Sequence, residues 1–467
     1  MKLKKYSLYM LFAALLLGSC KKQLQQDDPD VIGEANAFRT FEHIQQGVNE
    51  AYGRYSTYNS DMYKSALVSD EAKLGADNSG QGALEYRYQY SADVTTGGSV
   101  IAGYYGYYSL IDQINRVLPN IDLVEISASQ IPRKDIVRGY LLGLRGLAHF
   151  GLLQSFCKTY NANEPMGVPI MLESNPLARP ARNTMGDVMT QIEKDLSDAK
   201  SLVPAAIPAN FGDTVLNKVN IAAFQARIAL YKGDYQAAIT YATEVISSNV
   251  KPLVSGTDFS SIWTDESFNE SLFRVRFLNN PAIGAQWTTL AGSIYIAPSD
   301  KLVQSFSADD IRKNAYIGTN GAGNNYINKF YGSPRGGRMV DIKACRTAEM
   351  YLIRAEAYAK LTTPNVSAGA ADLNFLRGKR ITGYTDESFA SAADLITAVM
   401  NERFKELCFE GFRLYDLKRN NLPVQRNASD ANPAWQTLPA GSYRFVMPIP
   451  QGEILANPNM VQNEGYF

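Results

Sequence analysis

The chain has 467 residues, of which 45% are hydrophobic and 20% are charged, which is enough apolar material for a large folded body. Lys and Arg together number 46, and so do Asp and Glu, so the formal net charge is zero. A balanced charge creates no long-range field that would attract nucleic acid or an anionic membrane face, and neither is an expected partner.

The first 20 residues have the pattern of a lipoprotein export signal. Three lysines precede an apolar run at 8–17, and small residues then lead to Cys20. About ten apolar residues form a helix of roughly 15 Å, half of a bilayer core, which is too short for a stable transmembrane anchor. An ordinary secretory signal is the alternative. The pattern favours a cleaved signal at 1–19, an acylated Cys20 and a polar tether at 20–35, followed by a water-soluble body at 36–467.

Apolar residues at helical spacing predict three long helices in the first half of this body. The first ends at Pro119, the second covers 138–156, and the third starts at Thr184, whose side chain can form a cap with Asp187. Three glycines in the second helix would let another helix approach closely. These glycines are Gly139, Gly143 and Gly146.

Two pairs of helices follow, and their pattern is that of helical repeats. The segments 217–231 and 235–247, joined by a Gly-Asp turn, resemble a tetratricopeptide unit in which small residues let antiparallel helices nest. The segments 346–361 and 368–380 repeat the arrangement, and a last long helix is predicted at 392–410 with Gly411 as its C-terminal cap.

Long irregular stretches at 65–100 and 250–340 interrupt the helices. They are rich in Gly, Asn, Ser and aromatic residues, and loops this long in a compact body are usually functional or disordered. The predicted fold is therefore mostly α: a tetratricopeptide-like superhelix of helical pairs with long loops and little β structure. Helical repeats near 104–157, 184–249 and 346–411 would surround a loop-rich ligand region.

The chain offers few residues for metal binding or nucleophilic catalysis. It has two histidines, His43 and His149, which excludes a His-rich metal site, and His149 lies in a helical apolar pattern where we expect it to be packed. The cysteines after Cys20 are odd in number and have apolar or helical neighbours, so we expect buried free thiols rather than disulfides. They are Cys157, Cys345 and Cys408.

Charged and aromatic residues alternate in the late part of the chain, at 402–419. Glu410, Arg413 and Asp416 lie between aromatic side chains at the predicted end of a helix. Partly buried ion pairs at element ends are ordinary scaffold devices, so we expect these three charges to pair with one another rather than to act in catalysis.

The 402–419 run, the closing segment 448–466 with its Pro-Ile-Pro and Asn-Pro-Asn motifs, and Cys20 together resemble the SusD/RagB family of lipoproteins. Further similar segments follow the order of the family, at 143–150, 167–170 and 348–357. The sequence departs from the family pattern at Phe412, at Asn420 and Asn421, and at Glu464. The resemblance spans essentially the whole body.

The resemblance implies a surface-facing outer-membrane lipoprotein that binds a nutrient and closes over a SusC-like TonB-dependent transporter. It implies neither an enzyme nor a cofactor or metal, and the common hydrolase, phosphate-loop and zinc-protease motifs are absent from the sequence. Glycan is the expected cargo, with peptide as the runner-up because the RagB branch suggests peptides. A lipid-anchored glycan hydrolase, which has no short signature, or a helical scaffold without a ligand would also be consistent with the sequence.

A glycan site needs flat aromatic faces surrounded by polar side chains that bond to hydroxyls. The loop-rich stretches supply such residues, and we predict six ligand contacts. They are Asn78, Tyr86, Arg87, Tyr88, Trp287 and Tyr295. For Tyr86, Tyr88 and Tyr90, the alternative is one face of a half-buried strand. For Asn78, the alternative is a simple turn.

Overall fold

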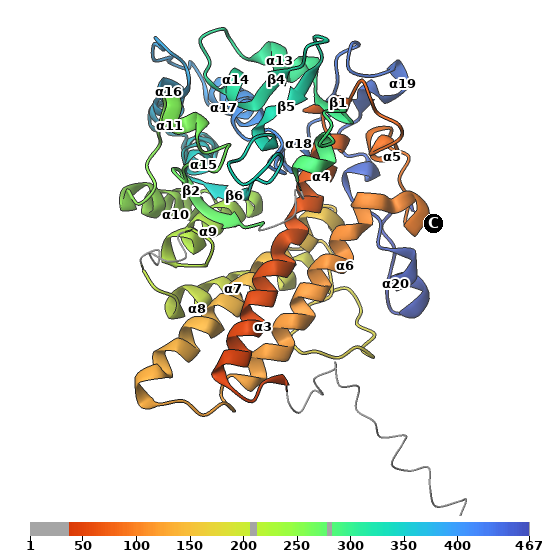
Figure 1. Cartoon of the computed structure of the whole chain (residues 1–467), viewed down its shortest axis with the longest axis vertical. Coiled ribbons are helices and arrows are strands. Elements are labelled where there is room, and N and C mark those ends of the chain that lie inside the picture. The colour runs from red at the N-terminus through yellow and green to blue at the C-terminus, as the bar shows by residue number, and fades with distance from the viewer. Residues whose placement is uncertain (1–36, 206–212, 278–282, 467) are drawn as a thin grey trace, which may run out of the picture.

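Helices dominate the computed structural model (Figure 1). The structure describes residues 37–205, 213–277 and 283–466. The predicted signal, Cys20 and the whole of the tether therefore lie outside the described residues. Within the described part, no helix is both long enough and apolar enough to cross a membrane.

Four long helices form the lower half of the molecule in Figure 1. They are α3 (Phe41–Arg54), α6 (Val94–Val117), α7 (Ile131–Phe156) and α8 (Met185–Leu202). The glycines of α7 lie against α8, as predicted: a Cβ on Gly139 would be 2.8 Å from Cγ1 of Val203, and one on Gly146 would be 3.3 Å from Cβ of Asp195. The predicted cap of α8 is also confirmed, because the hydroxyl of Thr184 accepts from the backbone N–H of Asp187.

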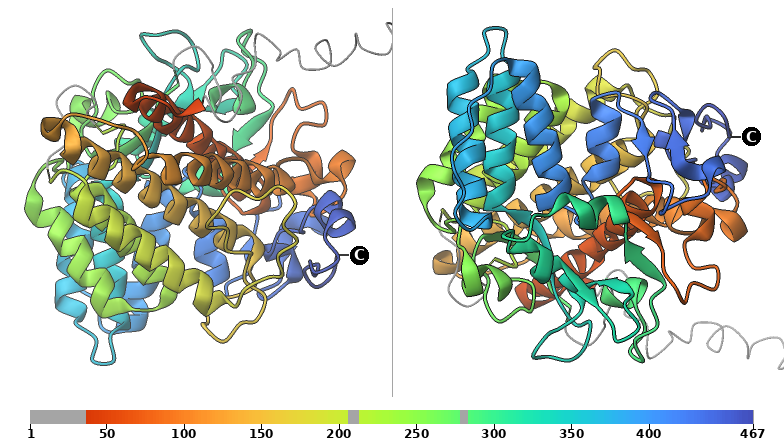
Figure 2. Two further views of the ribbon diagram at one scale, coloured as in Figure 1. Left: turned by 90° about the horizontal axis from the view of Figure 1, so that it is seen from below. Right: turned by 90° about the horizontal axis from the view of Figure 1, so that it is seen from above.

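Helical pairs build much of the remainder, which confirms the predicted fold class. The helices are α9 (Lys218–Lys232), α10 (Tyr235–Ser248), α15 (Thr347–Lys360), α16 (Val366–Arg380) and α17 (Ala392–Glu406). Gly233, with a φ of 85°, makes the left-handed turn between α9 and α10. The right-hand view of Figure 2 shows α15, α16 and α17 side by side.

The last of these helices is shorter than predicted. We expected it to reach residue 410, but α17 ends at Glu406, and Phe409 adopts a left-handed φ of 63°. Gly411, with a φ of 90°, lies in the turn that follows instead of capping the helix. A separate helix, α18 (Arg413–Arg419), follows this turn.

Strands are short and occur in four antiparallel pairs within the described residues. The pairs are β1 (Ala72–Leu74) with β3 (Ile296–Pro298), β2 (Ser271–Val275) with β6 (Ile342–Arg346), β4 (Ile317–Thr319) with β5 (Asn325–Ile327), and β7 (Val424–Gln425) with β8 (Thr437–Leu438). The first pair joins the two predicted loop regions, since it links 65–100 to 250–340.

Short helices occupy the connections, so the two loop regions contain more regular structure than we expected. The α-helices are α4 (Tyr58–Val68), α5 (Ala83–Tyr86), α11 (Gly256–Ser260), α12 (Gly284–Trp287), α13 (Asp300–Ser305), α14 (Arg312–Tyr316), α19 (Pro433–Gln436) and α20 (Gln451–Ala456). The 3-10 turns are η1 (Tyr55–Thr57), η2 (Leu118–Asn120), η3 (Ala128–Gln130), η4 (Asn328–Phe330) and η5 (Tyr443–Phe445).

A cluster of buried charges joins these elements. Glu406 of α17 is fully buried and accepts hydrogen bonds from three guanidinium groups, on Arg312, Arg346 and Arg380. The prediction that Glu410, Arg413 and Asp416 pair with one another was wrong. Each is paired instead with charged residues outside this set of three, most of which lie on other elements. The partners are Arg346 and Lys329 for Glu410, Asp70 for Arg413, and Arg403 and Arg419 for Asp416.

Candidate ligand-binding site

The predicted ligand contacts lie around the β1–β3 pair, where the two loop regions meet. The amide of Asn78 donates to the carbonyl oxygens of Gln81, at 2.8 Å, and Tyr295, at 2.9 Å. Its own side-chain oxygen accepts from the backbone N–H of Gly80 at 2.9 Å. The structure therefore brings Asn78 and Tyr295 together. The side chain of Asn78 also stabilises the turn at 78–81, which is the alternative role that the sequence suggested for it.

Two of the predicted aromatic contacts are buried in this conformation. Tyr86 is 2% exposed and donates to the carbonyl oxygen of Asp430 at 2.6 Å. Trp287 is 1% exposed and its ring centroid lies 5.4 Å from that of Tyr63. Neither ring has a free face, because both are part of the hydrophobic core.

The other contacts keep part of their surface exposed. Arg87 lies over the ring of Trp435 at 4.9 Å, and Tyr88 has a left-handed φ of 59°. Because α5 ends at Tyr86 and the chain turns at Tyr88, these residues do not form a half-buried strand. Ligand contact by the six residues stays a prediction.

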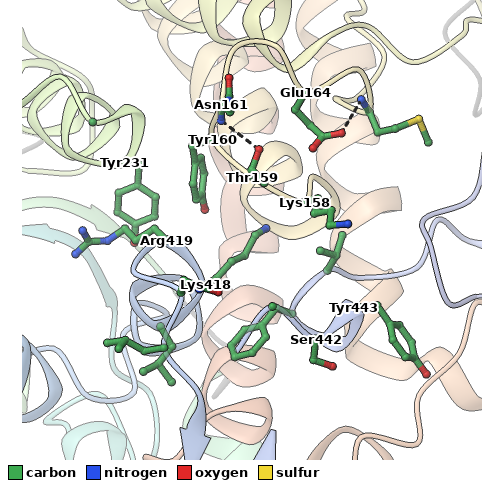
Figure 3. A pocket seen from close by; sticks show the side chains of 18 of the residues that line it. Lys158, Thr159, Tyr160, Asn161, Glu164, Tyr231, Lys418, Arg419, Ser442 and Tyr443 are labelled. Atoms are coloured by element: carbon green, nitrogen blue, oxygen red, sulfur yellow. Dashed lines mark hydrogen bonds between the residues drawn. The ribbon is translucent and has the colours of Figure 1, made fainter. Parts of the chain in front are cut away.

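A large cavity lies elsewhere, between the end of α7, the α9–α10 turn, α18 and the C-terminal segment (Figure 3). This C-terminal cavity has a volume of about 1060 Å³, which is large enough for a ligand of several sugar rings. Residues with ring, amide or charged side chains line it, among them Lys158, Tyr160, Asn161, Glu164, Tyr231, Lys418, Arg419 and Tyr443.

Two tyrosine rings form one wall of the C-terminal cavity. The rings of Tyr160 and Tyr231 meet edge to face, with centroids 5.3 Å apart and an interplanar angle of 86°. The ammonium of Lys418 lies 5.5 Å from the centroid of Tyr160, and the guanidinium of Arg419 lies 5.2 Å from that of Tyr231. Both cations stabilise the wall by packing against the rings.

Lys418 extends into the cavity beside Tyr160, as Figure 3 shows. Its ammonium donates to the carbonyl oxygens of Gln154, at 2.8 Å, and Cys157, so it caps the C-terminal end of α7. Burial lowers the pKa of Lys418 to about 8. The ammonium has three N–H groups, of which these carbonyls use two.

Opposite charges lie at the mouth of the cavity. Lys158 and Glu464 form an exposed ion pair with a separation of 2.9 Å between Nζ and Oε2. Glu164 forms no ion pair with any described residue, and one of its oxygens accepts weakly from the backbone N–H of Met166. The cavity thus combines partly exposed rings, a carboxylate, amides and an ammonium, the set of groups that binds a hydroxyl-rich ligand.

Sequence reasoning did not select the cavity residues, although a signal was present. The cavity is bordered by the end of the 402–419 run and by residues 462–465, that is, by both of the late motifs that carry the family resemblance. These two motifs are separated in the sequence by a segment that includes Tyr443. Their convergence on one hollow depends on the fold, which the motifs alone do not specify.

The histidine and cysteine predictions are confirmed. His149 is fully buried, its Nδ1 bonds to the carbonyl oxygen of Arg145 at 3.0 Å, and its Nε2 accepts from the backbone N–H of Met171. Burial lowers the pKa of His149 to about 4, so the ring is a neutral packing residue. The cysteines Cys157, Cys345 and Cys408 are buried free thiols. No cluster of potential metal ligands occurs in the part of the chain that the structure describes.

Comparisons with known proteins match both halves of the chain. Residues 312–466 match the model of the SusD family, and residues 26–230 match a family model described as "Starch-binding associating with outer membrane". SusD-like protein P2 of Formosa agariphila is 21% identical over 523 aligned positions, covering 99% of this chain and all of the relative.

Solved structures share the fold. A putative sugar binding protein from Bacteroides vulgatus has a TM-score of 0.81 and 25% identity, with 92% of this chain and 100% of that one covered. A laminarin binding SusD-like protein has a TM-score of 0.69 and 19% identity, with 92% and 100% covered.

Proposed function

Because this chain belongs to the SusD family, we propose that it binds an oligosaccharide at the outer membrane and delivers it to a SusC-like TonB-dependent transporter without hydrolysing it. One matching model is described as starch-binding, one relative as sugar binding and another as laminarin binding, which supports a carbohydrate as the cargo. The predicted acylation of Cys20 would supply the membrane anchor.

The C-terminal cavity is the observation that carries the proposal. The partly exposed rings of Tyr160 and Tyr443 offer apolar surface to sugar rings, while Glu164 and the third N–H of Lys418 are available to sugar hydroxyls. The six predicted contacts around the β1–β3 pair are a second place to test, and four of them are partly exposed. The amide of Asn78, however, is already bonded within the protein.

Titration calorimetry with starch-type and laminarin-type oligosaccharides tests the proposal. We expect binding that weakens about five- to tenfold in Tyr443→Ala and in Glu164→Gln, because a lost aromatic or hydrogen-bonded contact costs roughly 1 kcal/mol. Phe375→Ala is the matched control for Tyr443, since Phe375 is a 47% exposed aromatic residue on α16 that does not line the cavity.

The same experiment distinguishes an oligosaccharide carrier from a peptide carrier and from a hydrolase. A peptide that binds in place of the oligosaccharides would assign a RagB-like cargo, and release of reducing sugar would make the protein a hydrolase. Replacing Cys20 by Ala should release the protein from the membrane and impair uptake, while the affinity for the oligosaccharide in solution stays the same. Binding that is unchanged in both cavity variants would contradict the cavity as the site.

A further inference from the structure

A second hollow lies beside α6, on the side where α20 and the segment 169–180 approach it. Figure 1 shows α20 to the right of α6. This tyrosine groove has a volume of about 400 Å³, which suits a single sugar residue better than a chain. Its lining includes Tyr105, Tyr108, Asp112, Glu173 and Glu453, together with one cationic residue, Arg116.

Three tyrosines of α6 form the aromatic part of the groove. The ring centroids of Tyr104 and Tyr108 are 4.8 Å apart at 58°, and those of Tyr104 and Tyr105 are 6.1 Å apart at 85°. Tyr105 is 45% exposed, whereas Tyr108 is held by a hydrogen bond from its hydroxyl to the carbonyl oxygen of Pro169 at 3.0 Å. Tyr104 is 3% exposed and also packs against Phe156, so it backs the groove, and the aromatic surface open to a ligand comes from Tyr105 and Tyr108.

Carboxylates supply the charge of the groove. Glu453 accepts from the amide of Asn457 at 3.1 Å, and neither Glu453 nor Glu173 forms an ion pair with any residue that the structure describes. The third carboxylate, on Asp112, pairs with Arg116 at 2.8 Å. Burial and the charge of Glu453 raise the pKa of Tyr105, so this carboxylate acts on the groove.

We propose that the tyrosine groove binds a protonated primary amine carried by a sugar residue, that is, an amino sugar with a free amine. Aromatic faces beside carboxylates recognise an ammonium group, because ring quadrupoles and anionic oxygens both attract it. The same carboxylates repel a sugar that carries a carboxylate or sulfate. The proposal goes beyond the proposed function, since it concerns a separate hollow and one chemical class of sugar.

Calorimetry with two trisaccharides tests the groove, at mildly acidic pH where free sugar amines are protonated. One is the β-1,4-linked trimer of glucosamine, and the other is its N-acetylated counterpart, which has the same rings and no charge. We expect the glucosamine trimer to bind about tenfold more tightly. The variants Glu453→Gln and Glu173→Gln should each weaken its binding several-fold, and Tyr105→Ala should do so as well.

The controls separate this proposal from the function proposed above. Asp386→Asn removes an equal charge at an exposed residue that lines neither the groove nor the C-terminal cavity, and it should leave glucosamine binding unchanged. Tyr443→Ala and Glu164→Gln report on the cavity, because neither residue lines the groove. Thermal melting should show that Glu453→Gln folds normally, because glutamine keeps an oxygen for Asn457. Equal affinity for the two trimers, or unchanged binding in the Glu453→Gln Glu173→Gln double variant, would overturn the proposal. Trilysine that binds as tightly as the glucosamine trimer would overturn the assignment to a sugar.

Discussion

Arg413 and Asp70 lie 343 positions apart in the chain and form a bidentate ion pair. Nε and Nη2 of Arg413 donate to the two carboxylate oxygens of Asp70 at 2.7 and 2.9 Å. Asp70 is 1% exposed, and Lys301 also donates to it at 2.7 Å. The ion pair holds α18, which belongs to the 402–419 run, against the segment that follows α4. It therefore links the N-terminal and C-terminal parts of the fold.

Replacing Arg413 by Met should therefore lower the free energy of unfolding by roughly 3 kcal/mol, because it leaves a buried carboxylate with one cation fewer. Burial alone would raise the pKa of Asp70, but Arg413 and Lys301 outweigh it and lower the pKa to about 2. The folded-state pKa is below the ordinary value of 3.8, so this stabilisation is present above about pH 4 and is lost as the pH falls toward 2.

Urea denaturation at neutral pH measures this effect. Lys158→Met is the control, since it breaks the exposed ion pair with Glu464 and should leave the midpoint where it is. Equal stability of Arg413→Met and the wild type would show that Lys301 alone neutralises Asp70.

The sequence could predict where helices start, but it could not predict which residue pairs with Arg413. Helical spacing and caps are local, so the starts of α8 and α9 could be predicted to within a residue of their observed positions. The partner of Arg413 could not be predicted, because an ion pair between residues 343 positions apart depends on how distant elements pack together. The same holds for the C-terminal cavity, whose walls come from six separate stretches of the chain.

The predicted glycan contacts show a second limit. Composition identified Trp287 and Tyr86 as loop aromatics, but whether a ring faces solvent or the core depends on its neighbours in space. Tyr63 and Phe409 cover Trp287, and neither is near it in sequence. Family motifs therefore predicted the fold, whereas residue types alone could not predict which rings are exposed to solvent.

Two glycine substitutions should have opposite effects on stability. A Cβ at Gly151 of α7 would lie 2.6 Å from Cε2 of Tyr107, whose hydroxyl is bonded to Asp61, so the ring has little room to move. Gly151→Ala should destabilise the protein by about 1–3 kcal/mol through overpacking. At Gly378 of α16 an added Cβ meets nothing within 4 Å, and Gly378→Ala should stabilise by about 0.5–1 kcal/mol.

Thermal melting of the two variants in parallel checks this prediction. Both substitutions add the same methyl group to a helix interior, so the difference between them isolates the packing of α7 against α6. Two melting temperatures that shift in the same direction would contradict the close approach of Tyr107 to Gly151.

The cysteine thiols should be unreactive in the folded protein. Burial raises the pKa of Cys157 to about 11 and that of Cys408 to about 12, and the pKa of Cys345 is raised as well, so few thiolates form at neutral pH. We expect Ellman's reagent to label none of the three before denaturation and all of them after it. Rapid labelling of Cys157 alone would instead indicate that the C-terminal end of α7, which Lys418 caps, opens.

Glu71 should make the stability of the protein depend on pH. Its side chain is fully buried next to Asp70, and burial raises its pKa to about 8, an effect that the backbone of Phe409 and the charge of Arg413 only partly offset. The folded state therefore keeps a proton that the unfolded state releases near the ordinary value of 4.5. Between these two values the unfolded state binds fewer protons, so stability falls as the pH rises and levels off above about pH 8.

Glu71→Gln removes this dependence, because a glutamine stays neutral in both states. The difference in unfolding free energy between Glu71→Gln and the wild type should be small near pH 5 and should favour the variant by on the order of 2–4 kcal/mol near pH 9. Any fixed effect of burying an amide is the same at both pH values and cancels from the comparison. Glu464→Gln, on the surface, should show no such change between the two pH values. A constant difference for Glu71→Gln across the range would mean that Glu71 is ionised in the folded protein, and the cations Arg413 and Lys329 would then have to outweigh its burial.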